Sequence, residues 1–284
     1  MLRLLGFSGS LNKRRVGRPK SPAIMHRGSA NHFMGGLFPI VPVLLRLAPD
    51  VAAAFRYGSG VPFEKFGPEG VFGLDVMNRG QYEHRLTSYW LRAMPDVQVR
   101  LEAGGRALDV GCGAGRVAVT LAKAFPKATV LGLDPDRESI RQAEAGAAEA
   151  GLSGRVSFVA STTGELDAGE GFDLITACDC VHDFAAPQPT LSEIRALLKP
   201  EGTLFMIEPR AADKLEDNIN PIATMLYGFS IFHCMTQSLA QGGPGLGTCM
   251  GPARTEKLLR EAGFHEFRQL EINSPTHLFY AARA

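Results

Sequence analysis

Three glycines at alternate positions follow an apolar stretch of the chain, and an aspartate lies two residues before the first of them. The apolar stretch 107–110 ends in Gly111, Gly113 and Gly115, and a segment with apolar residues at helical intervals follows immediately. This order predicts a strand, a tight turn and a helix. Glycine at these positions indicates a backbone that bends where side chains would collide, or that a ligand approaches closely. After the first strand of an open α/β sheet, such a turn lies where that architecture binds its ligand.

The spacing of the glycines distinguishes between two classes of ligand. Dinucleotide sites have Gly-x-Gly-x-x-Gly, in which the third glycine lets the helix pack closely while its N-terminus faces a pyrophosphate. Here the pattern is Gly-x-Gly-x-Gly, and Asp109 brings a negative charge towards the loop, which favours a cationic ligand over a diphosphate. A second predicted strand, 129–133, ends in Asp134, where an acid accepts hydrogen bonds from ribose hydroxyls. The pattern therefore predicts a site for a nucleoside with a charged, phosphate-free tail.

A second stretch whose side chains are able to take part in a reaction follows the predicted strand 172–177. Parallel strands end at the same edge of a sheet, so we expect residues 178–184 to lie beside the glycine loop. His182 titrates near neutral pH, and Asp183 next to it is able to orient it or stabilise its charge. Two interpretations stay open for His182: a proton acceptor, or a histidine that caps or packs the following helix.

The same stretch contains side chains that bind metals. Cys178 and Cys180 are too close to His182 for a structural zinc site, which usually pairs two well-separated ligand clusters. Cys234 and Cys249 would add ligands from a later segment. Because buried small thiols are the commoner outcome, we assign no metal, and capture of a metal or metalloid is kept as an alternative.

The glycine loop and the acid after the second strand resemble the class I S-adenosylmethionine-dependent methyltransferases, whose first motif has the form Asp-Val-Gly-Cys-Gly-x-Gly. The resemblance implies a Rossmann-like α/β fold: a doubly wound, mainly parallel seven-stranded sheet with a terminal antiparallel hairpin, preceded by a small helical segment. It also implies S-adenosyl-L-methionine as the cofactor. Ser161 stands where many relatives have an acid that touches the adenine amino group. The cofactor-binding residues implied are Asp109, Gly111, Cys112, Gly113, Gly115, Asp134, Pro135, Ser161, Asp179 and Cys180.

The His-Asp pair looks like that of plant and hydroxyindole O-methyltransferases, in which the histidine removes the proton of the acceptor hydroxyl. Carried over, His182 is the general base and Asp183 assists it. Glu208, after the predicted strand 203–207, stands where relatives place an acid against this histidine, and its negative charge would favour the imidazolium. A carboxylate that caps a turn explains Glu208 equally well.

The reaction that this resemblance implies is methyl transfer to a hydroxyl oxygen of a small hydrophobic or aromatic acceptor. Transfer to nitrogen, carbon or a metalloid is an alternative, as is a protein that binds the cofactor without methylating anything. The sequence is most similar to mycobacterial-type bacterial members, with which it shares Asp179 to Asp183, Leu198 to Thr203 and Glu216 to Pro221. Those relatives usually carry a winged-helix module, and the basic start of this sequence is not typical of one.

Composition excludes several other classes. With 284 residues, 45% hydrophobic residues and a net charge of +1, the chain is typical of globular proteins and offers no broad field for nucleic acid. Five cysteines without a regular framework indicate reduced thiols and a cytoplasmic location. No stretch reaches the ~18 uninterrupted apolar residues that a membrane span needs.

We divide the chain into three parts. Residues 1–35 are a basic tail that we expect to be disordered; an organellar transit peptide, a phosphate-binding arm and an upstream extension are alternatives. Residues 36–100 are a helical cover, with two short helices that break at Pro49-Asp50 and a longer helix over 74–94. Residues 101–284 are the catalytic domain, and its insertion, 210–250, suits either an acceptor pocket or a homodimer interface. We expect some of four aromatic side chains of the cover to face the pocket: Phe63, Phe66, Tyr82 and Trp90.

Overall fold

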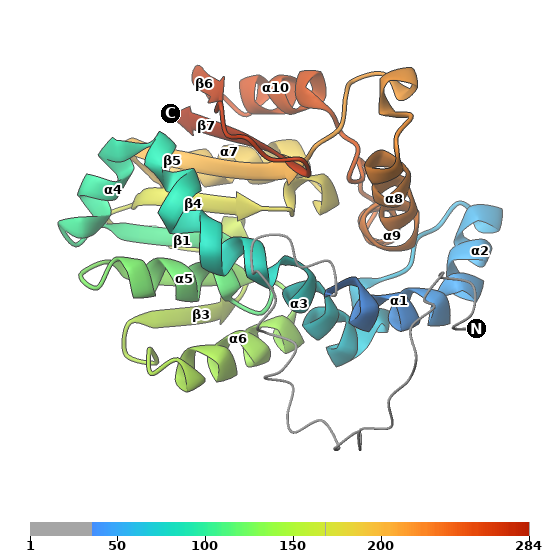
Figure 1. Ribbon diagram of the computed structural model, residues 1–284, viewed down its shortest axis with the longest axis horizontal. Coiled ribbons are helices and arrows are strands. Elements are labelled where there is room, and N and C mark those ends of the chain that lie inside the picture. The colour runs from blue at the N-terminus through green and yellow to red at the C-terminus, as the bar shows by residue number, and fades with distance from the viewer. Residues whose placement is uncertain (1–35, 168, 284) are drawn as a thin grey trace, which may run out of the picture.

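A single sheet of seven strands organises the part of the chain that the structure, a computed structural model, describes: residues 36–167 and 169–283. The expected tail, 1–35, lies outside that part. The strand order is β3-β2-β1-β4-β5-β7-β6, and β1 to β5 are mutually parallel, whereas β7 pairs antiparallel with β5 and β6 (Figure 1). This confirms the doubly wound sheet with a terminal antiparallel hairpin. The strands are β1 (Arg106–Val110), β2 (Thr129–Asp134), β3 (Val156–Ala160), β4 (Phe172–Cys178), β5 (Leu198–Pro209), β6 (Glu266–Gln269) and β7 (His277–Arg283).

Neighbouring residues of each central strand belong to different cores, because successive side chains point to opposite faces of a sheet. Ala107 packs in one hydrophobic cluster with α4 (Pro95–Glu102), α5 (Arg116–Ala124) and α6 (Arg137–Glu149). Leu108 packs in the other with α7 (Pro187–Leu197) and α10 (Pro252–Glu261). The sheet is therefore buried on both faces, as its apolar strands predicted.

Strand β5 is longer than expected. It begins at Leu198, before the predicted strand 203–207, and its pairing with β4 shifts register between Phe172 and Leu174. Its carboxyl end is regular and places Glu208 opposite Leu278 of β7.

The cover contains α1 (Leu37–Arg46), α2 (Ala48–Tyr57), a 3₁₀ turn (Phe63–Phe66) and α3 (Gly67–Arg85). The break between α1 and α2 comes at Leu47, earlier than predicted, because Pro49 sits in the first turn of α2, where its missing N–H costs nothing. The helix expected over 74–94 is also wrong at both ends. It begins at Gly67 and gives way to a π-helical segment, Leu86–Trp90, and a short 3₁₀ turn, Leu91–Ala93.

The insertion between β5 and α10 forms a second wall at the carboxyl ends of the strands. It contains a 3₁₀ turn (Leu215–Asn218), α8 (Pro221–Phe229), a π-helical segment (Ser230–Cys234) and α9 (Met235–Ala240). The Asn220 side chain caps α8 by accepting a hydrogen bond from Ala223 N at 2.9 Å. Figure 1 shows the cover and the insertion together beyond the arrowheads of the strands. They share a third hydrophobic cluster, in which Phe229, Ile231 and Phe232 pack against α1, α2 and Phe66.

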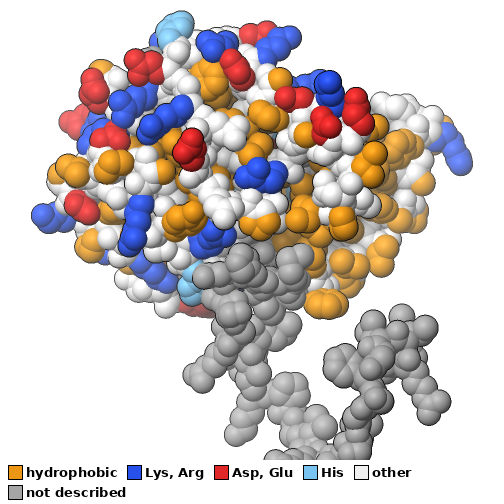
Figure 2. Space-filling view, turned by 45° about the horizontal axis from the view of Figure 1, so that its top comes forward, with side chains coloured by type: hydrophobic (Ala, Val, Ile, Leu, Met, Phe, Trp, Pro, Cys, Tyr) orange, Lys and Arg blue, Asp and Glu red, His pale blue; other side chains and the backbone are white. Residues whose placement is uncertain are grey.

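No single helix in the described residues is long and apolar enough to cross a membrane; α1 and α2 together pass that test, but they bend by 54° where they meet. Their inner faces are buried in the third cluster, whereas several outer side chains are exposed. Figure 2 shows hydrophobic side chains gathered on the right of the molecule, the side where Figure 1 places these helices. The exposed side chains of the two helices are Phe38, Val41, Leu45, Phe55 and Tyr57.

Candidate active site

A cavity of about 1200 Å³ lies at the carboxyl ends of β1, β2 and β4, between the sheet, the cover and the insertion. It is the place that a doubly wound sheet offers to a ligand. All but one of the predicted cofactor-binding residues line it, and the exception is Gly115. The residues at its wall are Asp109, Gly111, Cys112, Gly113, Asp134, Pro135, Ser161, Asp179 and Cys180.

The three loop glycines are required for different reasons. All have positive φ angles, which disfavour residues with a side chain. A Cβ on Gly111 would lie 2.9 Å from the Cβ of Cys180, whereas one on Gly113 would meet nothing within 4 Å, because Gly113 faces the cavity. A Cβ on Gly115 would lie 2.7 Å from the Phe158 ring, so this glycine permits packing of α5 against the sheet.

Asp134 holds the glycine loop in place. Its two carboxylate oxygens accept hydrogen bonds from Gly113 N and Asp136 N, both at 2.9 Å. Burial raises the pKa of Asp134 to about 6. Each carboxylate oxygen accepts more than one hydrogen bond, so Asp134 retains the capacity to bind two ligand hydroxyls.

Asp109 is a buried carboxyl beside the same loop. It is 1% exposed, and Thr176 Oγ1 donates a hydrogen bond to its Oδ1 at 2.7 Å. Its Oδ2 has no hydrogen-bond partner within the described residues. Burial raises the pKa of Asp109 to about 7. A cation in the cavity would stabilise the charged carboxylate.

Asp179, directly after β4, is held from two sides. The Tyr82 hydroxyl donates to its Oδ2 at 2.6 Å, and His277 Nε2 lies 3.1 Å from its Oδ1. Burial would raise the pKa of Asp179, but the two partners outweigh burial and lower it. Asp179 has a φ of +54°, which is uncommon for a residue with a side chain. No sequence motif pointed to His277, because it lies at the start of β7, 98 residues after Asp179.

His182 is fixed on the cavity wall by Glu208. Its Nδ1 lies 2.5 Å from Glu208 Oε2, and Val181 N donates to Glu208 Oε1 at 3.2 Å. Its Nε2 lies 3.4 Å from Asp183 Oδ1. Burial alone would lower the pKa of His182, but the charges of Glu208 and Asp183 raise it well above its usual value. Glu208 itself does not line the cavity, so its contact with any ligand passes through His182.

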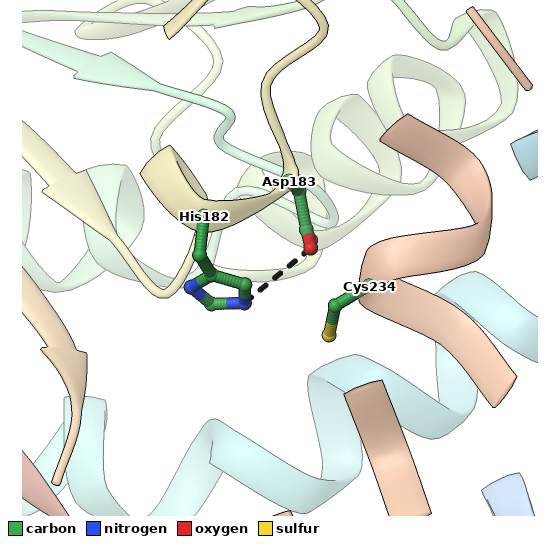
Figure 3. Close-up of side chains that lie close together, drawn as sticks. All are labelled: His182, Asp183 and Cys234. Carbon is green, nitrogen blue, oxygen red and sulfur yellow. Dashed lines mark ion pairs between the residues drawn. The ribbon is translucent and has the colours of Figure 1, made fainter. Parts of the chain in front are cut away.

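Cys234, in the insertion, faces this histidine and Asp183. Figure 3 shows His182 and Asp183 extending from one turn towards the Cys234 side chain, which comes from a separate helical segment. Burial raises the pKa of the Cys234 thiol to about 12 and that of Asp183 to about 6. The insertion is tied to the turn by backbone and side-chain hydrogen bonds, from Gly247 N to His182 O at 3.2 Å and from Ser238 Oγ to Phe184 O at 3.0 Å.

The insertion supplies the apolar part of the cavity. Its lining side chains are Ile222, Met225, Leu226, Phe229 and His233. His233 is 4% exposed, and its ring packs edge-on against Phe66 at 4.8 Å and Phe63 at 5.8 Å. Burial lowers the pKa of His233 to about 3, so the ring is neutral, and its Nε2 has no hydrogen-bond partner in the described residues. The helical spacing of apolar residues in the insertion predicted packing, and it did not indicate that His233 lines the cavity.

We expected some of four aromatic residues of the cover at the cavity, and two of them, Phe63 and Tyr82, line it. The other two do not. Phe66 is fully buried in the third cluster, and Trp90 is fully buried against Phe279 of β7, with ring centroids 5.0 Å apart.

Comparison with known proteins agrees with this architecture. Residues 101–263, more than half of the chain, match the family model described as a methyltransferase domain. A ubiquinone biosynthesis O-methyltransferase from Bartonella bacilliformis is 34% identical over 105 residues, which are 37% of this chain and 41% of that protein. The chain thus spans about two fifths of the length of the curated relatives it matches.

Two solved structures share the fold over most of the chain. An O-methyltransferase family protein from Burkholderia thailandensis has a TM-score of 0.60 at 21% identity, covering 87% of this chain and 71% of that one. NcsB1, an O-methyltransferase from neocarzinostatin biosynthesis, was solved with S-adenosyl-L-homocysteine and 1,4-dihydroxy-2-naphthoic acid. It has a TM-score of 0.60 at 17% identity, covering 90% of this chain and 74% of that one. Together with the family match and the glycine-loop cavity, these likenesses establish that the chain belongs to the methyltransferase domain family.

Proposed function

We propose that the protein transfers the methyl group of S-adenosyl-L-methionine to a hydroxyl oxygen of a small, hydrophobic or aromatic acceptor, with His182 as the general base. The observation that carries this proposal is the His182–Glu208 contact of 2.5 Å at the cavity wall. Glu208 holds a proton on Nδ1, so the form of His182 that has lost its Nε2 proton directs a lone pair from Nε2, which is the arrangement that a base requires.

Residues at the carboxyl edge of the sheet support the assignment of S-adenosyl-L-methionine as the cofactor. The ribose hydroxyls are assigned to Asp134, whose carboxylate lies at the tip of β2, and the adenine end to the neighbourhood of Ser161. The Ser161 hydroxyl, which lines the cavity, donates to Glu165 Oε2 at 3.0 Å, and Glu165 itself lies outside the cavity wall, so it orients the hydroxyl without reaching the ligand space. Asp109, with one oxygen unpartnered in the described residues, suits the positively charged end of the methyl donor.

Features of the insertion support the acceptor. Its methionine, leucine and phenylalanine side chains form an apolar pocket wall, which suits a flat hydrophobic molecule. The solved neighbour with a dihydroxynaphthoic acid bound has the same fold. A buried neutral imidazole, His233, offers one polar contact within this apolar wall.

The mechanism is an in-line displacement. The acceptor oxygen forms a bond to the methyl carbon as the carbon–sulfur bond breaks, the hydroxyl proton passes to His182 Nε2, and S-adenosyl-L-homocysteine leaves. Glu208 stabilises the imidazolium that forms. Holding both reactants at contact supplies up to ~7 to 11 kcal/mol, and proton removal adds about 10²- to 10⁴-fold.

Asp183 assists from the other side of the ring, since its carboxylate lies near Nε2, where the proton arrives. Gly115 is assigned to the framework that shapes the cofactor loop, because it packs against β3 and does not reach the cavity.

Two further assignments concern the surroundings of the enzyme. We assign it to the cytoplasm, since all five cysteines are free, including the half-buried Cys249. We assign a homodimer interface to the exposed apolar side chains of α1 and α2, because a patch of that kind marks a contact surface. Light scattering of the purified protein tests the dimer, and a monomer at every concentration contradicts it.

The experiment that tests the proposed function has two stages. Calorimetry compares binding of S-adenosyl-L-methionine with that of NAD, and we expect binding of the first only. The enzyme is then incubated with the methyl donor and a panel of phenols, naphthols, quinols, anilines and thiols. We expect a methylated phenolic oxygen, located by nuclear magnetic resonance of the product. Methylation of nitrogen or carbon alone contradicts the assigned acceptor atom, and binding without any product identifies a silent cofactor-binding protein.

A further inference from the structure

Three side chains of different chemistry meet at one point of the cavity wall. His182 and Asp183 belong to the 3₁₀ turn Val181–Asp183, and Cys234 ends the π-helical segment of the insertion. One ligand atom of each residue lies within 4.8 Å of the other two. Figure 3 shows the three side chains directed towards a common space. In the described part of the chain, this is the group of three histidine, cysteine or acidic residues whose ligand atoms lie this close together.

We propose that His182, Asp183 and Cys234 bind one divalent cation of the Zn²⁺ type, with the fourth position of the ion open to the cavity. Nitrogen, oxygen and sulfur together suit zinc, whereas Mg²⁺ and Ca²⁺ prefer oxygen alone. Two ligands that are about 2.0 to 2.1 Å from a tetrahedral ion lie roughly 3.3 Å apart. His182 Nε2 and Asp183 Oδ1 are 3.4 Å apart, so these two need almost no movement.

The surroundings of the histidine fit this role. A histidine that binds a metal usually donates its other ring N–H to a carboxylate, which fixes the tautomer and the orientation of the ring. Glu208 Oε2, 2.5 Å from Nδ1, is such a carboxylate and lies on a strand that is paired on both sides. The lone pair of Nε2 is thereby directed towards Asp183 and Cys234.

A second and independent observation is an unsatisfied oxygen. Asp183 Oδ1 is inaccessible to solvent and has no hydrogen-bond partner in the part of the chain that the structure describes. A buried polar atom in this state is costly unless a ligand satisfies it. His182 Nε2 lies 3.4 Å from this oxygen. The cation would lie between these two atoms and the Cys234 sulfur.

The charges also balance. A neutral imidazole, a carboxylate and a thiolate sum to two negative charges, which a divalent cation neutralises. Such neutralisation matters here, because His182 is 2% exposed and Cys234 is 5% exposed. The ion would also join the turn after β4 to the insertion, two segments that already share hydrogen bonds.

The two uses of His182 exclude one another. Nε2 cannot hold the cation and accept the proton of an acceptor at the same time, so the metal-bound protein is a different state from the one that performs the proposed base step. The inference about the metal stands on the three ligand atoms and does not depend on methyl transfer.

The test uses the full chain, freed of metal with a chelator, and needs no acceptor. Zn²⁺ is titrated by calorimetry in the presence of excess Mg²⁺, and Co²⁺ serves as a spectroscopic probe. We expect one ion per chain and a sulfur-to-cobalt charge-transfer band in the ultraviolet. The variant Cys234→Ala should lose the band and bind Zn²⁺ at least tenfold more weakly. Glu208→Gln should keep the band but bind 10- to 100-fold more weakly, as is usual when the partner of a metal-bound histidine is changed.

Cys249→Ala is the matched control, because Cys249 is a second thiol of the insertion that lies outside the cluster. It should behave like the unchanged protein. Binding of S-adenosyl-L-homocysteine by each variant shows that it is folded. The proposal is overturned if the unchanged protein does not bind Zn²⁺ in a saturable way, or if Cys234→Ala binds it equally well. A protein that binds the ion but methylates no acceptor loses only the proposed function.

Discussion

The Tyr82 hydroxyl donates a hydrogen bond of 2.6 Å to Asp179, and this contact joins α3 of the cover to the residue that follows β4. His277, at the start of β7, lies on the other side of the same carboxylate. A side chain 97 residues earlier in the chain and one 98 residues later thus orient a single acid at the cavity wall. Because both residues line the cavity, removing the contact tests whether the cover takes part in cofactor binding.

We expect Tyr82→Phe to lower the free energy of unfolding by about 1.5 to 3 kcal/mol, because the hydrogen bond goes to a charged group. It should also weaken binding of S-adenosyl-L-methionine. Chemical denaturation and calorimetry measure the two effects. Tyr280→Phe is the matched control, since the Tyr280 hydroxyl is buried without a partner in the described residues, away from the cavity. Its loss should be neutral or stabilising. If Tyr82→Phe and Tyr280→Phe change the cofactor affinity equally, Tyr82 does not contribute to cofactor binding.

Cofactor affinity should depend on pH through Asp134. Burial raises the pKa of Asp134 to about 6, and the ionised carboxylate is the form that accepts hydrogen bonds from both ribose hydroxyls. Protonation of Asp134 removes acceptor capacity, so the affinity should fall as the pH drops through about 6. Asp109, whose pKa burial raises to about 7, adds a separate fall that begins at higher pH, because its charge is lost first. Calorimetry at a series of pH values measures both, and Asp134→Asn should bind weakly and lose the fall near pH 6 but keep the one near 7. An unchanged profile in Asp134→Asn would assign the titration to another group.

His182→Gln should reduce kcat by about 10²- to 10⁴-fold, because it removes the proton acceptor. Binding of S-adenosyl-L-methionine should be unchanged, since His182 lies on the acceptor side of the cavity. Steady-state kinetics with the best acceptor and calorimetry with the cofactor separate the two effects. Glu208→Gln, which keeps a side chain of the same shape, should lower kcat less. An unchanged kcat in His182→Gln would show that His182 is not the base and that the rate comes from the placement of the reactants alone.

His233→Leu should change the free energy of unfolding little, because it removes the buried Nε2, which has no partner in the described residues, but also removes Nδ1, which lies 3.4 Å from Gln237 Nε2. The acceptor KM should rise, and cofactor affinity should not change. Thermal unfolding and kinetics with two acceptors, one with a second oxygen substituent and one without, measure both expectations. If KM changes equally for the two acceptors, His233 does not contact that substituent.

Local patterns predicted the part of the cavity wall that surrounds the glycine loop. The alternation of apolar runs and glycines gave β1 to β4 to within a residue or two. The part of the wall that the insertion forms depends on contacts between distant segments, which no local pattern records. Cys234 meets His182 only after the insertion folds back over the sheet, and the π-helical segment Leu86–Trp90 arises from packing that overrides helical periodicity.

Glu208 is anchored in the middle of the sheet, between β4 and β7, whereas the apolar wall opposite His182 is carried by a separate segment, 210–250, outside the layered core. In the proposed mechanism, the proton acceptor and the acceptor pocket therefore belong to parts of the chain that tolerate substitution to different degrees. Substitutions in residues 210–250 would change which compound the pocket accepts. They would leave the contact between His182 and Glu208 in place.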